Sequence, residues 1–293
     1  MGFNERAPFN RHEERELDRE LFINKAYEKA LTSVHEAEID PEKFRDLYGK
    51  EAVDADRAYI EEMERTFAAE GEPSEAQKLG TIFEALLHNQ ITYGGWFGKE
   101  SSAQKTSRYD DVKNGIDEVV EIEVHEAATS YLGLALDATL GGTDEKFKRI
   151  KREIDERKLG TVKYFRSKRG EFRGELSHVP RVVVAADAKT VIELATLWLE
   201  KKSKELREHP FQHQVLEEIE LQLAHFEAYA RARGEEESST ADTFARSRAV
   251  IESIHALKKE EFRDDPKKRD GGLRKVRGHL SIFSVQEKEG DLK

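Results

Sequence analysis

Two acidic residues of this sequence lie inside short apolar segments. Asp117 lies in the segment 115–120, GIDEVV, and Asp137 lies in the segment 134–140, LALDATL. A carboxylate in an apolar strand loses its hydration, so it needs a cation, hydrogen bonds or a proton in compensation. A loop separates the two segments, which are expected to pair as a hairpin and so bring both carboxylates to one cation. We therefore predict a divalent-metal site at Asp117 and Asp137.

Each carboxylate also has a structural interpretation. Asp117 follows Asn114-Gly115, and an Asp in that place often serves as a turn or hydrogen-bonding residue. Asp137 lies in mid-strand between two apolar residues. Because buried carboxylates are rare unless they are paired, its position favours a functional role.

Two strands are expected to position these carboxylates, over residues 116–124 and 132–140. Alternation along the second strand places large apolar residues on one face. The other face carries small or polar residues, which suits a cavity: Gly133, Ala135, Asp137 and Thr139. On the first strand, Glu121 and Glu123 share the face of Asp117 and are further candidate metal ligands.

A third acidic candidate lies on the helix expected from residue 74 to about residue 91. Ser74 and Gln77 have capping-box spacing at its start. Its apolar stripe consists of Leu79, Ile82, Phe83, Leu86, Leu87 and Ile91. Glu84 falls at the shoulder of that stripe, where it can point toward a site at the edge of the core or remain solvated. Residues 94–110 show no periodicity, which predicts a loop.

The elements that follow complete an alternating order. A basic helix is expected at about 144–158, and strands are expected at 161–166 and 180–186. A further helix is expected from Thr190, which has capping-box spacing with the Glu three residues later. The order is therefore helix, strands, helix, strand, helix.

This order, together with Glu84, Asp117 and Asp137, resembles the PD-(D/E)xK phosphodiesterase superfamily, the restriction-endonuclease-like nucleases, over about residues 74–200. The resemblance implies an αβββαβ core in which Glu84 is the helix acid, Asp117 the first strand acid and Asp137 the second. It also implies that these residues bind Mg²⁺ or Mn²⁺ and that the protein hydrolyses nucleic-acid phosphodiester bonds. The expected fold class is α/β, a restriction-endonuclease-like core with N- and C-terminal helical additions.

The chain departs from the family pattern at Thr139, where the family has a lysine two residues after the second acid. The nearest basic residues are Lys146 and Lys148 in the following helix and Lys163 in the next strand. Some members of the superfamily are similar in carrying this lysine on the neighbouring helix, so Lys146 and Lys148 are the expected replacements. The rival interpretation is a non-catalytic interaction or scaffold protein that keeps a nuclease-like fold and makes its contacts through long charged helices.

Basic residues are concentrated between Lys146 and Arg173, where twelve basic residues accompany four acidic ones. In a chain of net charge −11, such a segment predicts a contact surface for a phosphate backbone. The residues expected to contact nucleic acid, DNA rather than RNA, are Lys151, Arg152, Lys163, Arg166, Lys168 and Arg169. The alternative is a solvated face whose charge is balanced by acidic helices elsewhere.

Three residues spaced four apart, His209, His213 and Glu217, could hold a transition metal on one face of a helix. No HExxH motif is present, and Pro210 places His209 at the boundary of the helix. This context favours a capping or exposed role.

The composition restricts the remaining classes of protein. The 293-residue chain is 37% charged but periodic, which is typical of long solvated helices, and the lack of cysteine excludes disulfides and thiol nucleophiles. No apolar run reaches membrane-spanning length and the first residues are charged, so we expect a cytoplasmic protein with no membrane partner. The expected regions are a helical N-terminal region at 1–72, a nuclease-like core at 73–205, a helical C-terminal region at 206–262 and a flexible basic tail at 263–293. The helical regions offer contacts for a homo-oligomer.

Overall fold

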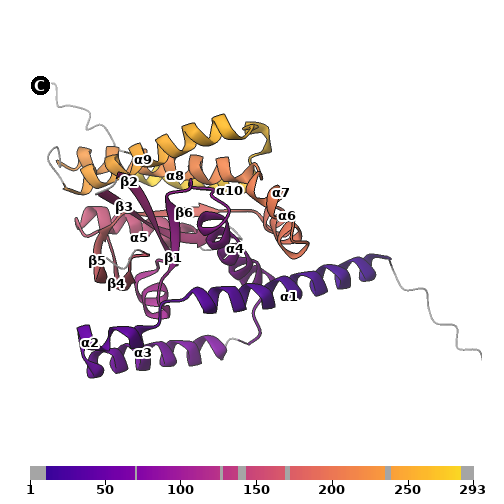
Figure 1. Cartoon of the computed structure of the whole chain (residues 1–293), viewed down its shortest axis with the longest axis horizontal. Helices are drawn as coiled ribbons and strands as arrows, with labels where there is room; N and C mark the ends of the chain where they lie inside the picture. Colours follow the sequence, from indigo (N-terminus) through magenta and orange to yellow (C-terminus); the bar gives the residue numbers. More distant parts are fainter. Residues whose placement is uncertain are drawn as a thin grey trace, which may run out of the picture.

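The computed structural model describes residues 11–69, 71–125, 128–137, 143–168, 172–234 and 239–284, without the side chains of residues 11–13, 124–125, 128–130 and 133–137. These residues form a mixed α/β fold that is mostly helical and contains two small sheets (Figure 1). The expected α/β class is confirmed at that level.

The larger sheet has four strands in the order β1-β2-β3-β6. They are β1 (Ser101–Lys105), β2 (Glu118–His125), β3 (Ala128–Asp137) and β6 (Arg181–Ala185). The first three are antiparallel neighbours, and β6 runs parallel to β3. The predicted hairpin is confirmed, with Glu118 of β2 opposite Leu134 of β3.

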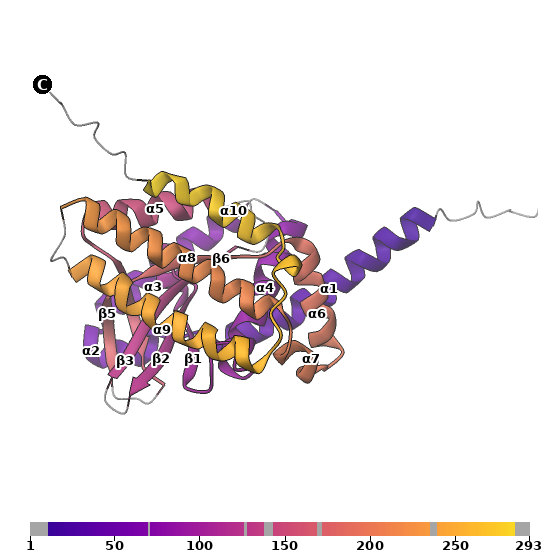
Figure 2. The ribbon, with the colours of Figure 1, turned by 90° about the horizontal axis from the view of Figure 1, so that it is seen from above.

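Helices cover the sheet on both sides: in Figure 1, α8, α9 and α10 lie above it, and α4 and α1 lie below it. Figure 2 shows α8 and α9 side by side over the strands. The helices are α1 (Arg11–Ala37), α2 (Arg45–Tyr48), α3 (Lys50–Ala68), α4 (Glu75–Thr92), α5 (Thr143–Asp155), α6 (Ala188–Leu199), α7 (Ser203–Arg207), α8 (Phe211–Ala232), α9 (Ser239–Glu261) and α10 (Gly271–His279). Short helical turns are η1 (Pro41–Phe44), η2 (Asp110–Asn114), η3 (Pro266–Lys268) and η4 (Leu280–Phe283). Within the described ranges, no helix is both long and apolar enough to cross a membrane.

Helix α4 forms as the sequence predicts. The Ser74 side chain accepts a hydrogen bond from the backbone N–H of Gln77, and the Gln77 side chain accepts one from the backbone N–H of Ser74 at 2.8 Å. This reciprocal pair satisfies backbone donors that the first turn of a helix leaves without partners. All the apolar residues predicted for this helix are buried in the main core.

Helix α8 takes the place of a further strand beside β6. Gln222 accepts a hydrogen bond from the N–H of Val183 and donates one to the carbonyl of the same residue, each at 2.7 Å. Glu218 accepts a hydrogen bond from the N–H of Ala185 at 2.9 Å. An edge strand exposes unpaired backbone groups, and burying them without partners is costly. Two polar side chains therefore allow β6 to lie buried at the edge of the sheet.

The segment predicted as a loop at 94–110 contains β1, so this prediction was wrong. Sequence periodicity does not reveal β1, because its polar residues are buried by tertiary packing: Ser101, Ser102 and Lys105. The strand expected at 161–166 exists as β4 (Gly160–Arg166), but it pairs with β5 (Arg173–Val179) in a separate two-stranded sheet. Strand β5 was not predicted from the sequence.

Two further expectations need correction. Helix α6 is capped by Asp187, whose carboxylate accepts a hydrogen bond from the N–H of Thr190 at 2.8 Å, so Thr190 does not begin a capping box. The segment expected as a flexible tail includes α10 and η4, whose apolar side chains join the core: Val276, Leu280 and Phe283. Residues 285–293 lie outside the described part.

Replacing Gln222 with Leu tests the role of α8 at the edge of β6. The variant leaves both buried backbone groups of Val183 without their partners, at a cost of about 1–3 kcal/mol each. We expect the free energy of unfolding, measured by urea denaturation, to fall by about 2–4 kcal/mol. A His225→Leu change on the exposed face of the same helix is the control and should have an effect within about 0.5 kcal/mol. Equal effects of the two changes would contradict this account of the edge.

Candidate functional site

Charged residues from four elements meet at one end of the larger sheet. Glu84 comes from α4, Lys105 ends β1, Asp111 lies in η2, Glu118 begins β2 and Asp117 directly precedes it. Lys105 lies opposite Glu118 in the β1–β2 ladder, and its side chain is only 3% exposed. We call these five residues the Lys105 cluster.

The ammonium of Lys105 holds the cluster together. Its Nζ donates hydrogen bonds to the carboxylate of Glu84 and, at 2.5 Å, to the backbone carbonyl of Asp117. Burial lowers the pKa of Lys105, but the nearby carboxylates, that of Glu84 foremost, outweigh this effect and raise the pKa above its ordinary value. Lys105 is therefore a permanent buried cation, fixed beside the predicted helix acid and first strand acid.

Asp111 and Asp117 form a carboxyl pair beside this cation. The pKa of Asp111 is raised from 3.8 to about 8, first by burial and then by the negative charge of Asp117 and a hydrogen bond between the two side chains. Two close carboxylates cannot both ionise freely, so the pair keeps one proton over a wide pH range. Arg108 opposes this shift through its ion pair with Asp111 at 2.5 Å.

The turn that carries Asp111 is itself fixed by hydrogen bonds. The Thr106 hydroxyl donates to the carbonyl of Ile116 at 2.6 Å and thus ties the end of β1 to the approach to β2. The neighbouring carboxylate of Asp110 accepts hydrogen bonds from the backbone N–H groups of Lys163 and Tyr164 at 2.7 and 3.0 Å. This excursion between β1 and β2 brings Asp111 to Asp117.

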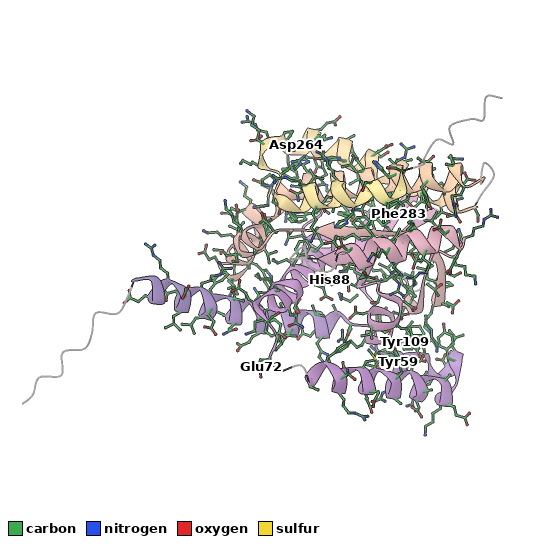
Figure 3. The ribbon with its side chains drawn as sticks, turned by 180° about the vertical axis from the view of Figure 1, so that it is seen from behind. Tyr59, Glu72, His88, Tyr109, Asp264 and Phe283 are labelled. Atoms are coloured by element: carbon green, nitrogen blue, oxygen red, sulfur yellow. The ribbon has the colours of Figure 1, made fainter. Side chains whose placement is uncertain are left out.

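A histidine extends the cluster along α4. His88 lies one helical turn after Glu84, and its Nδ1 is hydrogen-bonded to the carboxylate of Glu118, which is fully buried. Figure 3 places His88 in the interior of the molecule. Glu118 at the start of β2 and Asp117 directly before it therefore each contact residues of other elements.

The cluster opens into a cavity of about 640 Å³ between the core and the N-terminal helices. Residues of α1 and α3 line its far wall, and Tyr59 of α3 meets Tyr109 edge to face with ring centroids 6.1 Å apart (Figure 3). The acidic lining residues are Glu38, Asp56, Glu61, Glu64, Glu84 and Asp111, and the basic ones are Arg57, Lys105 and Arg108. This excess of carboxylates attracts a cation more readily than a phosphate.

Asp137 is the last residue of β3, and its side chain lies outside the described part. Because Glu118 pairs with Leu134 and the strands are antiparallel, Asp137 lies at the same end of the sheet as Asp117. Of the other candidate ligands, Glu121 accepts a hydrogen bond from the N–H of Lys168 at 3.1 Å, and its contact is with the β4–β5 hairpin. Glu123 also has a partner.

The lysines expected near the acids have other surroundings. Lys148 pairs with Glu145 at 2.7 Å and is 62% exposed, and Lys146 lies half-buried on the same helix and has a partner of its own. Lys163 pairs with Asp56 of α3 among aromatic rings. In the part of the chain that the structure describes, the lysine that contacts Glu84 is Lys105, which the sequence analysis placed in a loop.

The residues expected to contact nucleic acid do not all present free charge. Lys151 pairs with Asp155 at 3.0 Å and also donates a hydrogen bond to Tyr229, and Lys163 is paired as described. The exposed ones are Arg152, Arg166 and Lys168. Arg169 lies outside the described residues.

His209, His213 and Glu217, which helical spacing could have brought to one metal ion, do not form a group. His209 lies before α8, where its Nδ1 accepts a hydrogen bond from the N–H of Phe211 and its Nε2 lies 3.3 Å from Glu193. Glu217 pairs with Arg269 and Arg277. His213 is buried beside His255 and Asp264, a contact between segments that helical spacing alone does not reveal.

No protein-family model matches the chain, and comparisons with curated proteins and with solved structures find no significant match. The functional inference therefore depends on the geometry of the chain itself.

Replacing Asp111 with Asn tests the carboxyl pair through the pH dependence of stability. Since the folded-state pKa is raised, the neutral carboxyl stabilises the fold fully below about pH 4, and this contribution is lost as the pH rises toward 8. We expect the wild-type protein in EDTA to lose at least about 1 kcal/mol more than the variant between about pH 5 and pH 8. Urea denaturation at both pH values measures this difference. Parallel pH profiles of the two proteins would contradict the shared proton, because their constant offset would report only the lost ion pair with Arg108.

Proposed function

We propose that this protein is a metal-dependent phosphodiesterase that hydrolyses nucleic acid, with DNA as the expected substrate. The observation that carries the proposal is the carboxyl pair of Asp111 and Asp117 beside the buried ammonium of Lys105. Phosphoryl transfer needs positive charge near the phosphate, and this group of residues offers the ammonium of Lys105 together with carboxylates that can hold a cation.

The order of elements supports the same class. Helix α4, strands β1 to β3, helix α5 and strand β6 follow one another as αβββαβ, with the β4–β5 hairpin inserted before the last strand. The resemblance to the PD-(D/E)xK superfamily assigns its helix acid to Glu84, which lies on α4, and its first strand acid to Asp117, which directly precedes β2. A restriction-endonuclease-like core is thus our proposal for this part of the α/β fold.

The donor atoms of the site fit a hard divalent cation. Mg²⁺ and Mn²⁺ prefer oxygen ligands, and one or two protein carboxylates commonly suffice for Mg²⁺. The side chains of Asp111 and Asp117 hydrogen-bond each other, so a cation can replace the proton that they share. We propose Asp111 and Asp117 as ligands, with Glu84 and Asp137 as the further ligands expected from the sequence. When bound, the cation supplies a Lewis acid for the phosphoryl oxygen.

Lys105 is our proposed replacement for the lysine that the family carries at the position of Thr139. Its Nζ orients the carboxylate of Glu84 by direct hydrogen bonding. Its fixed positive charge also lies close enough to Asp117 to stabilise negative charge that develops on a phosphate bound beside these residues. Lys105 lies on a different strand from the family's lysine, but it supplies the same ammonium group.

One observation favours the non-catalytic scaffold as a second candidate. The ammonium of Lys105 already compensates the negative charge of Glu84. Among the described residues, the group whose three ligand atoms lie within 4.8 Å of one another is His213, His255 and Asp264, away from this cluster. In a scaffold, the cluster would serve only to join α4 to the sheet. The N-terminal helices would then make the partner contacts, including those of a homo-oligomer. A cytoplasmic location stays a prediction in both cases.

Asp117→Asn and Lys105→Met are the variants that test the nuclease. We expect the wild-type protein to cleave labelled single- or double-stranded DNA in Mg²⁺ or Mn²⁺ and to lose this activity in EDTA. Each variant should lower the rate at least about 100-fold, because Asp117→Asn removes a ligand of the cation and Lys105→Met removes a positive charge near the phosphate. RNA of both kinds is included to identify the substrate class.

Matched controls are Glu62→Gln, an exposed acid of α3, and Lys148→Met, an exposed lysine of α5. Both should keep the wild-type rate, and circular dichroism checks that every variant is folded. Absence of cleavage on all substrates, with Mn²⁺ binding equal in the wild type and Asp117→Asn, would leave the scaffold as the better account.

A further inference from the structure

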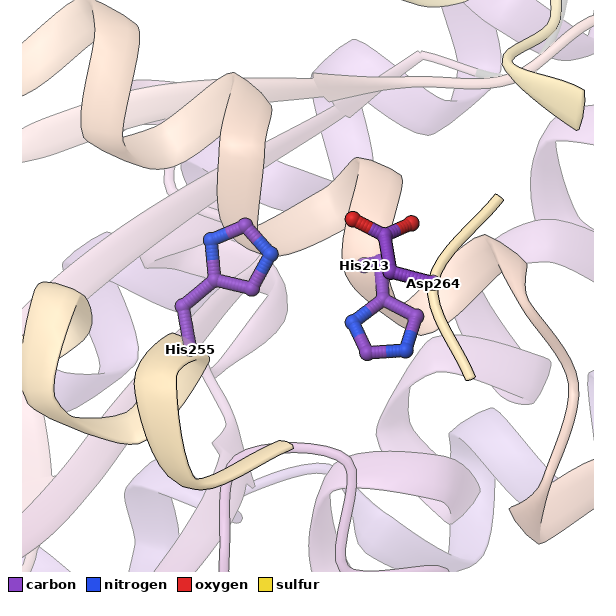
Figure 4. Close-up of side chains that lie close together, drawn as sticks. All are labelled: His213, His255 and Asp264. Carbon is purple, nitrogen blue, oxygen red and sulfur yellow. The ribbon is translucent and has the colours of Figure 1, made fainter. Parts of the chain in front are cut away.

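A second group of potential ligands lies on the opposite side of the sheet from α4. His213 comes from the first turn of α8, His255 from the last two turns of α9, and Asp264 from the segment between α9 and η3. One ligand atom of each residue lies within 4.8 Å of those of the other two. Figure 4 shows His255 reaching from α9 toward His213 and Asp264.

The two buried histidines have ring nitrogens without hydrogen-bond partners among the described residues. His213 is fully buried and His255 is 2% exposed. Among the described residues, neither ring nitrogen of His213 and not the Nε2 of His255 has a hydrogen-bond partner of normal geometry. A buried polar atom without a partner costs about 1–3 kcal/mol. One such nitrogen from each ring, with the carboxylate of Asp264 beside them, forms a group that could bind a metal ion.

The surrounding residues hold these ligands in a binding arrangement. The Nδ1 of His255 lies 2.8 Å from the carboxylate of Glu220, which leaves Nε2 as the free ligand atom. Metal-bound histidines almost always have such a partner on the other nitrogen, because it fixes the tautomer and orients the ring. Arg269 contacts both oxygens of Asp264 at 2.7 and 3.0 Å and is anchored in turn by Glu217 at 2.7 Å.

We propose that His213, His255 and Asp264 bind a divalent transition-metal ion, with Zn²⁺ as the best match. Two imidazole nitrogens and one carboxylate oxygen suit Zn²⁺, whereas Mg²⁺ and Ca²⁺ prefer oxygen alone. Three protein ligands leave the fourth position of a tetrahedral site for water or another small ligand.

The metal ion would fasten the C-terminal segment to the helical layer. Asp264 precedes η3 and α10, and α10 packs against β6 through the buried residues Leu273 and Val276. One ion bound by α8, α9 and this segment therefore joins three parts of the chain that are distant in sequence. Such an ion stabilises the folded state in proportion to its occupancy. The inference is independent of the proposed nuclease activity.

The test uses the full-length protein after a chelator has removed all metal. This protein is titrated with Zn²⁺ alone and, in a second experiment, with Co²⁺ as a spectroscopic probe. We expect one equivalent of Zn²⁺ to bind tightly and to raise Tm by roughly 5 °C at about 100 times the Kd. Bound Co²⁺ should show the visible absorption of a low-coordinate nitrogen and oxygen site. His255→Gln and Asp264→Asn should each weaken binding at least about 100-fold, since each removes one of three ligands.

Two controls locate the bound ion. His209→Gln changes a buried histidine near the same helix that is not in the group, and Asp111→Asn changes the carboxyl pair; both should bind Zn²⁺ like the wild type. If His255→Gln fails to fold, Asp264→Asn, whose side chain is 16% exposed in the wild type, decides the question. Equal Zn²⁺ binding by Asp264→Asn and the wild type, or loss of binding only in Asp111→Asn, would overturn the proposal.

Discussion

The structure depends on the compensation of charge at the buried ammonium of Lys105. This cation ends β1 and contacts both the carboxylate of Glu84 on α4 and the backbone next to β2. Without it, the acids of the cluster would have to be protonated or hydrated, and the helix could not approach the sheet as closely. The interaction therefore fixes the relative positions of α4, β1 and β2, and with them the walls of the cavity.

Helix α8 imposes a second constraint of the same kind. Its side chains satisfy the backbone of β6, and its first turn also binds the C-terminal segment: Gln214 donates to the carboxylate of Asp270 at 2.5 Å and accepts from the N–H of that residue at 2.7 Å. The same helix supplies His213 to the proposed metal group. Polar side chains of α8 thus connect the edge of the sheet, the C-terminal segment and the second site.

The sequence predicted the elements whose signals are local. The capping box at Ser74 and the apolar stripe of α4 are such signals, and so is the β-branched run that forms β6. Strand β1 was missed because nothing in the segment Ser101–Lys105 alternates between apolar and polar residues. Its burial results from α4 and β2, which lie on either side of it. A strand of this kind is identified only when its neighbours in space are known.

The two candidate sites show the same limit of sequence-based prediction for functional residues. The apolar neighbours of Asp117 in the sequence predicted that its carboxylate needs a compensating partner. Its partners Asp111 and Lys105, however, come from a turn and a strand that have no periodic signal in the sequence. Likewise, spacing along a helix drew attention to His213, yet its neighbours lie 42 and 51 residues later in the sequence. The two sites differ in their donor atoms, since one offers oxygen alone and the other offers two imidazoles. Hard and borderline cations should therefore distribute between them by chemistry, which allows the metal of each site to be assigned separately.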